Sequence, residues 1–395
     1  MIKKVRVNER LEYKIRRGFP WIFRKDADFG SHFVNGCGVA IYNKANRRVG
    51  FGLYDAYSPI AVRLLSLDLE FGRDYITRCL HQALKRREAY GIINAENNAF
   101  RVINGESEGL PAVIIDSYAG TWVLKLYSAL WLPYINDMIE IILSHFAPQS
   151  LILRFSRASR DSFEAAGYTE GQLLRGEAGS GYVVFSENGL RFSAQVFKGQ
   201  KTGFFLDQRD NRNLIRTLTN DCKVLDLCAF SGGFSLNAAM GGASEIWSVD
   251  ADKRALALIE KHYEMNATQL ASQRFRRVLQ HSDVFSWLRK QRGKRRFDLV
   301  IADPPSFASA KSQVEQAKQA YKRLFTGAAD CLRPGGQILC CSCSAHIGAE
   351  LFEQIIKESL GDRIRSAQDY TALPFDHPAS FAEARYLKTW LLQLR

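Results

Sequence analysis

Four aspartates each follow one of four successive apolar runs in the second half of the chain: Asp226, Asp250, Asp283 and Asp303. A carboxylate at such a position can attract a cationic amine, or accept hydrogen bonds from a ribose diol or an exocyclic amine. We assign the cationic amine to Asp226, the diol to Asp250 and an adenine amine to Asp283. One such aspartate is more often the N-cap of the next helix, but four in this order predict a nucleoside ligand that carries a positive charge.

The residues after Asp226 form a small-residue turn that leads into a predicted helix. Ser231, Gly232, Gly233 and Phe234 belong to this turn. Glycine lets the backbone approach a ligand closely, and the first N–H groups of a helix have no partner within the helix. The Gly-x-Gly-x-x-Gly spacing of dinucleotide-binding proteins is absent, which argues against NAD. The turn therefore adds backbone donors to the predicted nucleoside site.

The fourth aspartate begins the turn Asp303-Pro304-Pro305, which is followed by Phe307. Two prolines hold φ near about −65° and keep the acid and the neighbouring carbonyls directed at a flat substrate. The ring of Phe307 can stack on a base. In this interpretation Asp303 contacts both ligand and substrate, while Pro304 and Phe307 bind the substrate. The alternative is a plain turn that ends the strand.

A thiol stands just beyond the last strand of this region, at Cys343 between two serines. A thiolate can add to C6 of a pyrimidine and make C5 nucleophilic, which is the help that carbon methylation at C5 requires. Cys340 and Cys341 lie earlier in the strand, where we expect them to pack. A metal site that includes His346 is disfavoured, because adjacent strand residues point to opposite faces and no second Cys/His pair is evident. Cys343 is the candidate nucleophile.

Alternating strands and helices must position these residues beyond Gly189. We expect strands at Lys223–Leu227, Glu245–Val249, Arg276–Gln280, Leu299–Ala302 and Gln337–Cys341. We expect helices at Gly233–Met240, Lys253–Asn266, Val284–Gln291 and Val314–Leu332. This alternation predicts an α/β fold with a parallel, doubly wound, Rossmann-like sheet, whose ligands bind at the carboxyl ends of the strands.

The N-terminal segment combines basic and aromatic residues, with nine Lys/Arg and two acids in residues 1–25. Short β-type runs follow at Gly38–Tyr42, Arg48–Tyr54 and Ile60–Leu67. We interpret residues 1–72 as a small β-barrel that contacts nucleic acid through phosphates and stacked bases. An amphipathic helix with a solvated, charged face is the alternative for the first segment. Residues 73–188, with a helix at Asp74–Tyr90, are interpreted as a central α+β domain, and residues 189–395 as the third domain.

Composition and length limit the class of protein and the number of domains. The chain has 395 residues, a formal charge of +13 and 46% hydrophobic residues, which suits two or three globular domains and argues against disorder. No apolar run approaches the ~20 residues of a membrane span, and no secretory signal is present. We therefore expect a cytoplasmic protein whose eight cysteines are reduced. The window Arg274–Arg296 carries nine Lys/Arg and one acid, and is either an RNA contact or a solvated turn.

Together these features resemble the RlmI-type methyltransferases, which form 5-methylcytosine in large-subunit (23S) ribosomal RNA. The resemblance covers nearly the whole chain and rests on Lys201–Arg212, Asp226–Phe234, Asp303-Pro304-Pro305, Ser342-Cys343-Ser344, Asn104–Pro111 and the basic N-terminal segment. It implies an N-terminal PUA domain that binds RNA, a central α+β domain and a class I methyltransferase domain.

The resemblance also implies a site. S-adenosylmethionine would be held by the four aspartates and the small-residue turn, with Phe205 and Asp207 at its border. Lys201 and Arg209 would bind the RNA, and Cys343 would be the nucleophile. The sequence leaves open whether the substrate is naked 23S RNA or an assembling subunit, and whether the protein is a monomer or a homodimer.

The sequence leaves one catalytic role unassigned and two alternative functions to consider. Many RNA cytosine-C5 methyltransferases carry a second cysteine where this chain has Ser306, and RlmI-type enzymes also lack it. The base that removes the C5 proton is therefore unassigned, with Asp303 as a hypothesis. A related branch methylates a guanine without a covalent intermediate, and Cys343 argues against it because a guanine nitrogen needs no thiol. A non-catalytic RNA-binding factor is the third alternative, against which the four aspartates argue.

Overall fold

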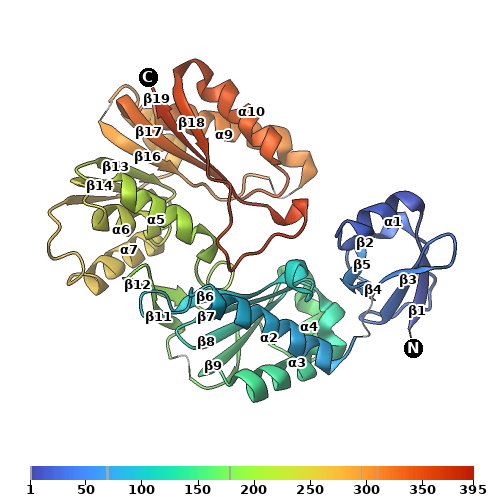
Figure 1. Ribbon diagram of the computed structural model, residues 1–395. Coiled ribbons are helices and arrows are strands. Elements are labelled where there is room, and N and C mark those ends of the chain that lie inside the picture. The colour runs from blue at the N-terminus through green and yellow to red at the C-terminus, as the bar shows by residue number, and fades with distance from the viewer. Residues whose placement is uncertain (1, 68–70, 178, 295, 309) are drawn as a thin grey trace. The chain divides into compact units, whose positions relative to one another are not determined.

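The computed structural model describes residues 2–67, 71–177, 179–294, 296–308 and 310–395 (Figure 1). Contacts divide the chain into two compact units. Unit 1 comprises Met1–Gly189, Ser193–Leu206 and Phe375–Ala384, and unit 2 comprises Leu190–Phe192, Asp207–Pro374 and Arg385–Arg395. Within the described ranges, no helix is long and apolar enough to cross a bilayer. The domain boundaries at 72/73 and 188/189 stay predictions.

The first sheet of unit 1 has five strands in the order β1-β3-β4-β5-β2. They are β1 (Lys3–Arg6), β2 (Trp21–Phe23), β3 (Gly38–Tyr42), β4 (Arg48–Tyr54) and β5 (Ile60–Ser66). The last three confirm the predicted runs. Helix α1 (Glu9–Arg16) begins after Asn8, whose side chain accepts a hydrogen bond from the N–H of Leu11 at 2.9 Å. Leu11 and Ile15 are buried on one face of α1, so the basic segment does contain the amphipathic helix.

The second sheet of unit 1 has the order β10-β9-β8-β7-β6. Its strands are β6 (Ala99–Asn104), β7 (Val113–Tyr118), β8 (Thr121–Leu126), β9 (Ser150–Phe155) and β10 (Gln172–Arg175). Helices α2 (Arg73–Ala89), α3 (Ile135–Ile141) and α4 (Arg160–Ala165) and the hairpin β11 (Tyr182–Glu187)–β12 (Leu190–Gln195) complete this region. Leu80 of α2 and Met138 of α3 pack in one core with the sheet residues Ile115 and Leu124, and α2 confirms the predicted helix.

Two buried ion pairs involve residues of this second sheet and of helix α2. The guanidinium of Arg101 donates to both carboxylate oxygens of Asp116, at 2.8 and 3.1 Å, and the Thr202 hydroxyl donates to the same carboxylate at 2.5 Å. The guanidinium of Arg87 donates to both oxygens of Glu108. Because each carboxylate meets a planar guanidinium with paired donors, these buried charges are satisfied.

Residues Phe375–Ala384 belong to unit 1 although the strands before and after them belong to unit 2. The Asp376 carboxylate accepts from the backbone N–H of Arg101 at 2.8 Å, and the guanidinium of Arg87 donates to the Asp376 carbonyl at 2.8 Å. The Asn104 amide donates to the carbonyl of Pro378 at 2.9 Å. These hydrogen bonds hold residues Phe375–Ala384, which connect the last two strands of the chain, against α2 and β6 of unit 1.

Unit 2 is built on a seven-stranded sheet in the order β15-β14-β13-β16-β17-β19-β18. Its strands are β13 (Lys223–Leu227), β14 (Glu245–Asp250), β15 (Arg276–His281), β16 (Phe297–Ala302), β17 (Leu332–Ser342), β18 (Ile364–Asp369) and β19 (Lys388–Leu394). The first five are parallel and confirm the five predicted strands. The sequence analysis missed β18 and β19, which pair antiparallel at one side of the sheet.

Helices cover both faces of this sheet. They are α5 (Arg209–Leu218), α6 (Gly233–Met240), α7 (Lys253–Met265), α8 (Val284–Gln291), α9 (Val314–Ala329) and α10 (Ala349–Leu360), and the four predicted helices are among them. Trp287 of α8, Leu324 of α9 and Phe352 of α10 share one apolar cluster with the sheet. Ser235 of α6 bonds to Asp226, whose side chain points away from that cluster because it alternates along β13 with Leu225 and Leu227.

Candidate active site

The order of the strands reverses between β13 and β16, at the centre of the sheet. The chain proceeds from β13 through β14 to β15 on one side, and then from β16 to β17 on the other. Ligands of such sheets bind where the order reverses, beyond the carboxyl ends of the strands. Asp226, Asp250, Asp303 and Cys343 lie at or just after the ends of β13, β14, β16 and β17. The structure therefore brings these four predicted residues to one edge of the sheet.

The turn after β13 has an uncommon backbone. Cys228 and Phe230 have φ of 61° and 47°, and Gly232 has φ of 75°. Positive φ is unfavourable for residues with a Cβ, so two of these three positions store backbone strain. A Cβ on Gly233 would lie 2.7 Å from Cδ of Arg212, so a larger residue here would force the Arg212 side chain to move. Strain of this kind is typical of ligand-binding turns.

A buried histidine supports this turn. The ring Nδ1 of His262 on α7 lies 2.8 Å from the carbonyl oxygen of Ser231, and His262 is fully buried. Burial lowers the pKa of His262 to about 4, so the ring is neutral at physiological pH and donates its Nδ1–H to the carbonyl. Phe234 and Ser231 are themselves buried. Sequence analysis missed His262, because nothing in the α7 sequence links it to the turn.

Asp226 is the most unusual carboxylate of the site. Its Oδ2 accepts from the Ser235 hydroxyl at 2.6 Å and from the Ser235 N–H at 3.1 Å, while its Oδ1 is buried and has no hydrogen-bond partner among the residues that the structure describes. Burial, together with the negative charges of Asp303 and Asp250, raises the pKa of Asp226 to about 7. A cationic group placed between these carboxylates would relieve this repulsion and pair with the orphan oxygen.

Asp250 and Asp283 are held by backbone donors. Asp250 Oδ2 accepts from the N–H of Phe230 and Oδ1 accepts from the N–H of Asp252, both at 2.8 Å. Asp283 Oδ1 accepts from the N–H of Ser286 at 2.9 Å, so Asp283 is the N-cap of α8. Asp250 thus ties the turn after β13 to the end of β14. The helix-cap alternative considered for a single strand-end aspartate is realised at Asp283, and its contact with an adenine stays a prediction.

Asp303 is positioned from the segment before β13. The side-chain amide of Gln208 donates to Asp303 Oδ2 at 3.0 Å, and the amide of Asn211 donates to Gln208 Oε1 at 2.6 Å. Both amides are buried, so the chain of hydrogen bonds is shielded from water. The Phe307 ring packs 4.8 Å from that of Tyr321 and 6.1 Å from that of Phe285. These two rings occupy part of the surface that Phe307 was predicted to offer to a base.

Cys343 sits between two buried, anchored serines. The Ser342 hydroxyl lies 2.9 Å from the hydroxyl of Tyr321, and the Ser344 hydroxyl donates to the carbonyl of Ala308 at 2.9 Å. Cys343 itself is partly exposed. The Ser344 bond joins the loop after β17 to the loop after β16, which carries Asp303 and Pro304. The serines therefore hold the backbone on both sides of a cysteine that is only partly buried.

The neighbouring thiols are unsuited to nucleophilic chemistry. Cys340 and Cys341 are fully buried, which confirms that they pack in the strand. Burial raises the pKa of both thiols well above the usual value, and it also raises the pKa of Cys228 at the end of β13. A thiol with a raised pKa is a poor source of thiolate. Cys343 is thus the accessible thiol on this strand end.

The predicted residues just before β13 fall on both sides of the division between the units. Lys201 and Phe205 belong to unit 1, where the Lys201 ammonium lies 4.6 Å from the centre of the Phe205 ring. Asp207 and Arg209 belong to unit 2 and are buried. The hydroxyl of Tyr386 donates to Asp207 Oδ2 at 2.5 Å. The cofactor and RNA contacts of these four residues stay predictions.

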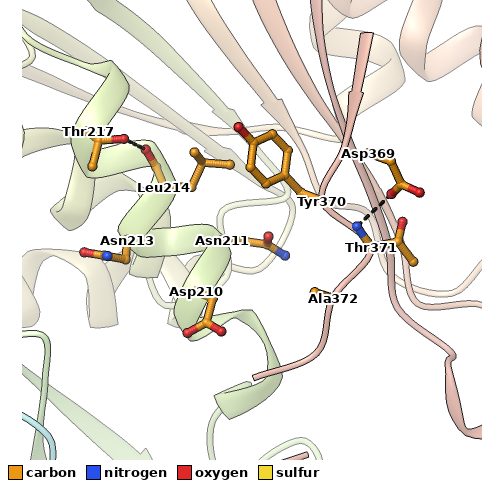
Figure 2. A pocket seen from close by; sticks show the side chains of 9 residues that line it. All are labelled: Asp210, Asn211, Asn213, Leu214, Thr217, Asp369, Tyr370, Thr371 and Ala372. Carbon is orange, nitrogen blue, oxygen red and sulfur yellow. Dashed lines mark hydrogen bonds between the residues drawn. The ribbon is translucent and has the colours of Figure 1, made fainter. Parts of the chain in front are cut away.

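A cavity of about 510 Å³ lies between α5 and the residues that follow β18 (Figure 2). Its lining comprises Asp210, Asn211, Asn213, Leu214, Thr217, Asp369, Tyr370, Thr371 and Ala372. Figure 2 shows Tyr370 and Leu214 on facing walls. None of the residues predicted for cofactor or RNA lines this cavity. Asn211 connects its wall to the site, because its amide donates to Gln208 Oε1 and the Gln208 amide donates to Asp303.

Basic residues show two patterns. At the end of α1, the guanidinium of the C-cap residue Arg17 lies over the ring of Tyr13, which is 59% exposed, so a cation and an aromatic face are presented together. In the window 274–296, Arg277 pairs with Glu260 at 2.9 Å and Arg296 lies over the ring of Trp247 at 4.8 Å. Arg295, which belongs to the same prediction, lies outside the described residues. Whether this window contacts RNA or is a solvated turn stays a prediction.

Comparisons with known proteins agree with this architecture. A family model for S-adenosylmethionine-dependent methyltransferases matches residues 166–373, and a model for a PUA-like domain matches residues 5–67. A ribosomal RNA large subunit methyltransferase from Deinococcus radiodurans is 39% identical over 401 residues, covering 99% of this chain and 97% of that protein. A ribosomal RNA large subunit methyltransferase I from Aeromonas salmonicida is 32% identical, covering 97% of each.

Solved structures show the same fold. A crystal structure described as a methyltransferase complexed with SAH (S-adenosylhomocysteine) matches with a TM-score of 0.84 at 23% identity, covering 99% of this chain and 100% of that chain. A protein from Streptococcus mutans described as a SAM-dependent methyltransferase matches with a TM-score of 0.83 at 22% identity and the same coverage. The orphan carboxylate oxygen of Asp226 and the strained turn beside it suit a cofactor that combines a charged amino-acid moiety with a nucleoside.

Proposed function

This chain belongs to the S-adenosylmethionine-dependent methyltransferases of large-subunit ribosomal RNA, and we propose that it methylates carbon 5 of a cytosine in that RNA through a covalent adduct on Cys343. The observation that carries the proposal is the accessible Cys343 between two anchored, buried serines at the carboxyl end of β17. A nucleophile needs an exposed sulfur on a rigid backbone, and a merely packed cysteine needs neither.

The cysteine performs the first and last steps. Its thiolate adds to C6 of the cytosine, an S–C6 bond forms, and the electron pair of the C5=C6 bond becomes available at C5. S-adenosylmethionine, when bound, supplies an electrophilic methyl group on a sulfonium. After C5 is methylated, a base removes the C5 proton, the C–H electron pair restores the C5=C6 bond, and Cys343 leaves as a thiolate. Asp303 is our candidate base, held by Gln208 at the end of β16.

The remaining predicted residues divide between cofactor and RNA. Asp226 would pair with the cationic amine of the cofactor through its orphan Oδ1, and Asp250 would accept from the ribose diol. The turn from Ser231 to Phe234 would contact the cofactor with backbone groups. Residues 5–67, with Tyr13 exposed on α1 and Arg17 exposed just after it, would bind RNA outside the active site.

The decisive experiment is methyl transfer from labelled S-adenosylmethionine to ribosomal RNA from a strain that lacks this protein. The labelled nucleoside is identified by mass. Wild type should form 5-methylcytosine, and Cys343→Ala should lose activity by about 10³-fold or more, because without the adduct C5 is not nucleophilic. Cys222→Ala is the matched control, since Cys222 is a partly exposed thiol in the same unit before β13. It should retain full activity.

Two results would overturn the proposal. A methylated guanine that forms equally well with Cys343→Ala would assign the protein to non-covalent purine methylation. Formation of 5-methylcytosine by Cys343→Ala at the wild-type rate would keep the product and exclude the thiolate mechanism. A direct check is a cross-link between Cys343 and RNA that contains 5-fluorocytosine, because fluorine at C5 cannot leave as a proton would and the adduct persists.

A further inference from the structure

A buried lysine lies next to the candidate nucleophile. Lys388 is the first residue of β19 and pairs with Ser342, the last residue of β17, in the antiparallel register. Its ammonium donates to the carbonyl of Ser344 at 2.7 Å and to the carbonyl of Tyr386 at 2.6 Å. Lys388 is only 2% exposed. Its side chain therefore extends past the strand end and bonds to the residue that follows Cys343.

This ammonium has no carboxylate partner. In the part of the chain that the structure describes, both of its hydrogen bonds go to neutral backbone carbonyls, and no carboxylate forms an ion pair with it. Burying a cation without an anion is unfavourable, and the loss of hydration lowers the pKa of Lys388 to about 8. Attraction to Cys343 opposes this lowering. The Cys343 thiolate is thus the anion available to this buried cation.

The other ionisable groups near the pair are already engaged. Asp303, on the loop after β16, accepts from the amide of Gln208. Tyr321, on α9, shares a hydrogen bond with Ser342, and burial raises its pKa, so it stays neutral. On the segment that precedes β19, the Tyr386 hydroxyl donates to Asp207. His346 lies three residues beyond Cys343 on the same loop, and Cys341 is buried and protonated.

The geometry points to Lys388 as the residue that creates and stabilises the Cys343 thiolate: the neutral amine takes the sulfur-bound proton, an N–H bond forms as the S–H bond breaks, and the resulting ammonium stays beside the thiolate. Lys388 acts through Cys343 and is therefore a positioning residue. This inference rests on the proposed covalent mechanism. Because Cys343 leaves the product as a thiolate, the proton can remain on Lys388 through every turnover. An ammonium cannot accept the C5 proton, which leaves that role to another group such as Asp303.

The test measures the thiol directly. Purified full-length protein is alkylated with iodoacetamide between pH 5.5 and 9.5, and the peptide that contains Cys343 is quantified by mass spectrometry. In wild type the alkylation rate should reach half its maximum below the ordinary thiol pKa of about 8.5. Lys388→Met, which has a similar length and no charge, should shift this midpoint upward by about one pH unit or more, a loss of about tenfold in rate at pH 7. Lys388→Arg should keep the low midpoint, because the cation remains.

Lys125→Met is the matched control. The Lys125 ammonium also donates to a backbone carbonyl, at 2.7 Å, and burial lowers its pKa to about 8 as well, but it belongs to unit 1. Its replacement should leave the Cys343 midpoint unchanged. Equal midpoints in wild type and Lys388→Met, with both proteins binding S-adenosylhomocysteine equally, would overturn the inference. If Lys388→Met does not fold, Lys388→Gln and Lys388→Arg supply the same comparison of neutral and cationic side chains.

Alkylation needs neither RNA nor methyl donor, so it separates this inference from the proposed function. A midpoint shift in Lys388→Met together with an active Cys343→Ala would keep the Lys388–Cys343 pair and exclude covalent catalysis. If both proposals hold, Lys388→Met should reduce kcat for RNA methylation most strongly at low pH, with KM for RNA unchanged. A merely structural role would instead reduce kcat equally at every pH.

Discussion

Two sets of buried ionisable groups, one in each unit, are arranged in opposite ways. In unit 1, Arg101 meets both carboxylate oxygens of Asp116, and the carboxylate is further bonded by Thr202. In the described part of unit 2, one oxygen of Asp226 is buried with no hydrogen bond, and both hydrogen bonds of the Lys388 ammonium go to backbone carbonyls. Both units bury ionisable groups completely, so burial alone does not distinguish an architectural charge from a functional one.

The difference lies in whether the charge is satisfied within the chain. A paired, hydrogen-bonded charge costs little to keep buried but a great deal if its partner is removed. An unsatisfied buried charge destabilises the free protein, and such charges gather at sites that bind ligands or perform chemistry. The pair in unit 1 therefore belongs to the scaffold, and the groups at the strand ends of unit 2 belong to the site. Each of the following changes tests one side of this comparison.

Arg101→Met should have the largest effect on stability. It leaves the Asp116 carboxylate buried without its cation, which costs about 3–5 kcal/mol. Hydrogen exchange followed by mass spectrometry should show faster exchange in β6 and β7, which carry the two partners. Arg276→Met is the control, because Arg276 is 72% exposed and its contact with Glu245 is 3.6 Å long. Its effect should stay within about 0.5 kcal/mol.

Unchanged exchange in β6 and β7 of Arg101→Met would contradict the scaffold assignment. A second contradiction would be loss of S-adenosylhomocysteine binding at full stability, because that pattern belongs to a ligand site. The double variant Arg101→Met, Asp116→Leu sharpens the test: removing both charges together should recover much of the stability, since no unpaired ion is left behind.

Asp226→Asn should increase stability, whereas Arg101→Met should decrease it. The folded-state pKa of Asp226 is raised to about 7, above its ordinary value, so the native protein holds a proton there that the unfolded chain has lost. Wild-type stability should therefore fall as pH rises from about 4 to about 7, because the ionised carboxylate is poorly accommodated. The asparagine variant does not ionise. The stability of Asp226→Asn relative to wild type should thus increase across this window by a few kcal/mol, at ~1.4 kcal/mol per unit of pKa shift.

Cofactor binding supplies the second readout for Asp226. A cationic amine favours the ionised carboxylate, so wild-type affinity for S-adenosylmethionine should rise with pH and level off above about 7. In Asp226→Asn the affinity should be lower and its dependence on pH should be flatter, measured by isothermal titration calorimetry between pH 5 and 8. An affinity for wild type that is constant over this range would contradict the proposed pairing of Asp226 with the amine.

Sequence patterns predicted the structure correctly where a short stretch of neighbouring residues determines it. The strand ends that carry Asp226, Asp250 and Asp303 follow from apolar runs of strand length, and the five parallel strands of unit 2 are confirmed. The packing of Cys340 and Cys341 is confirmed as well, because residues within a central strand are buried on both faces.

The supporting interactions are long-range, and no local pattern reports them. Gln208 and Asp303 are 95 residues apart, and Asp207 and Tyr386 are 179 residues apart. Strand β18 was missed because Ile364–Asp369 is mostly exposed and lacks an apolar run, so its pairing depends on β19 alone. Lys388 was missed for a related reason: a lysine in an apolar C-terminal run becomes informative only when its neighbour across the sheet is known.

Asp283 offers the smallest and most selective test, because two roles are assigned to one side chain. As N-cap of α8 it bonds to the N–H of Ser286, and as a cofactor ligand it would accept from the adenine amine. Asp283→Ala removes both functions, and the lost cap should cost about 1 kcal/mol of stability. Asp283→Ser keeps a good cap but removes the carboxylate, so its stability should match wild type.

The affinity for S-adenosylhomocysteine then separates the two roles. If Asp283 binds the adenine amine, both variants should bind about fivefold more weakly, which corresponds to about 1 kcal/mol for one hydrogen bond at an exposed residue. Asp283→Ser should then be stable yet weaker in binding, and Asp283→Ala impaired in both. Wild-type affinity in Asp283→Ser would assign Asp283 to the helix cap alone. In that case the carboxylate would belong with the satisfied charges of the scaffold, and the contrast would rest on the orphan oxygen of Asp226 at the end of β13.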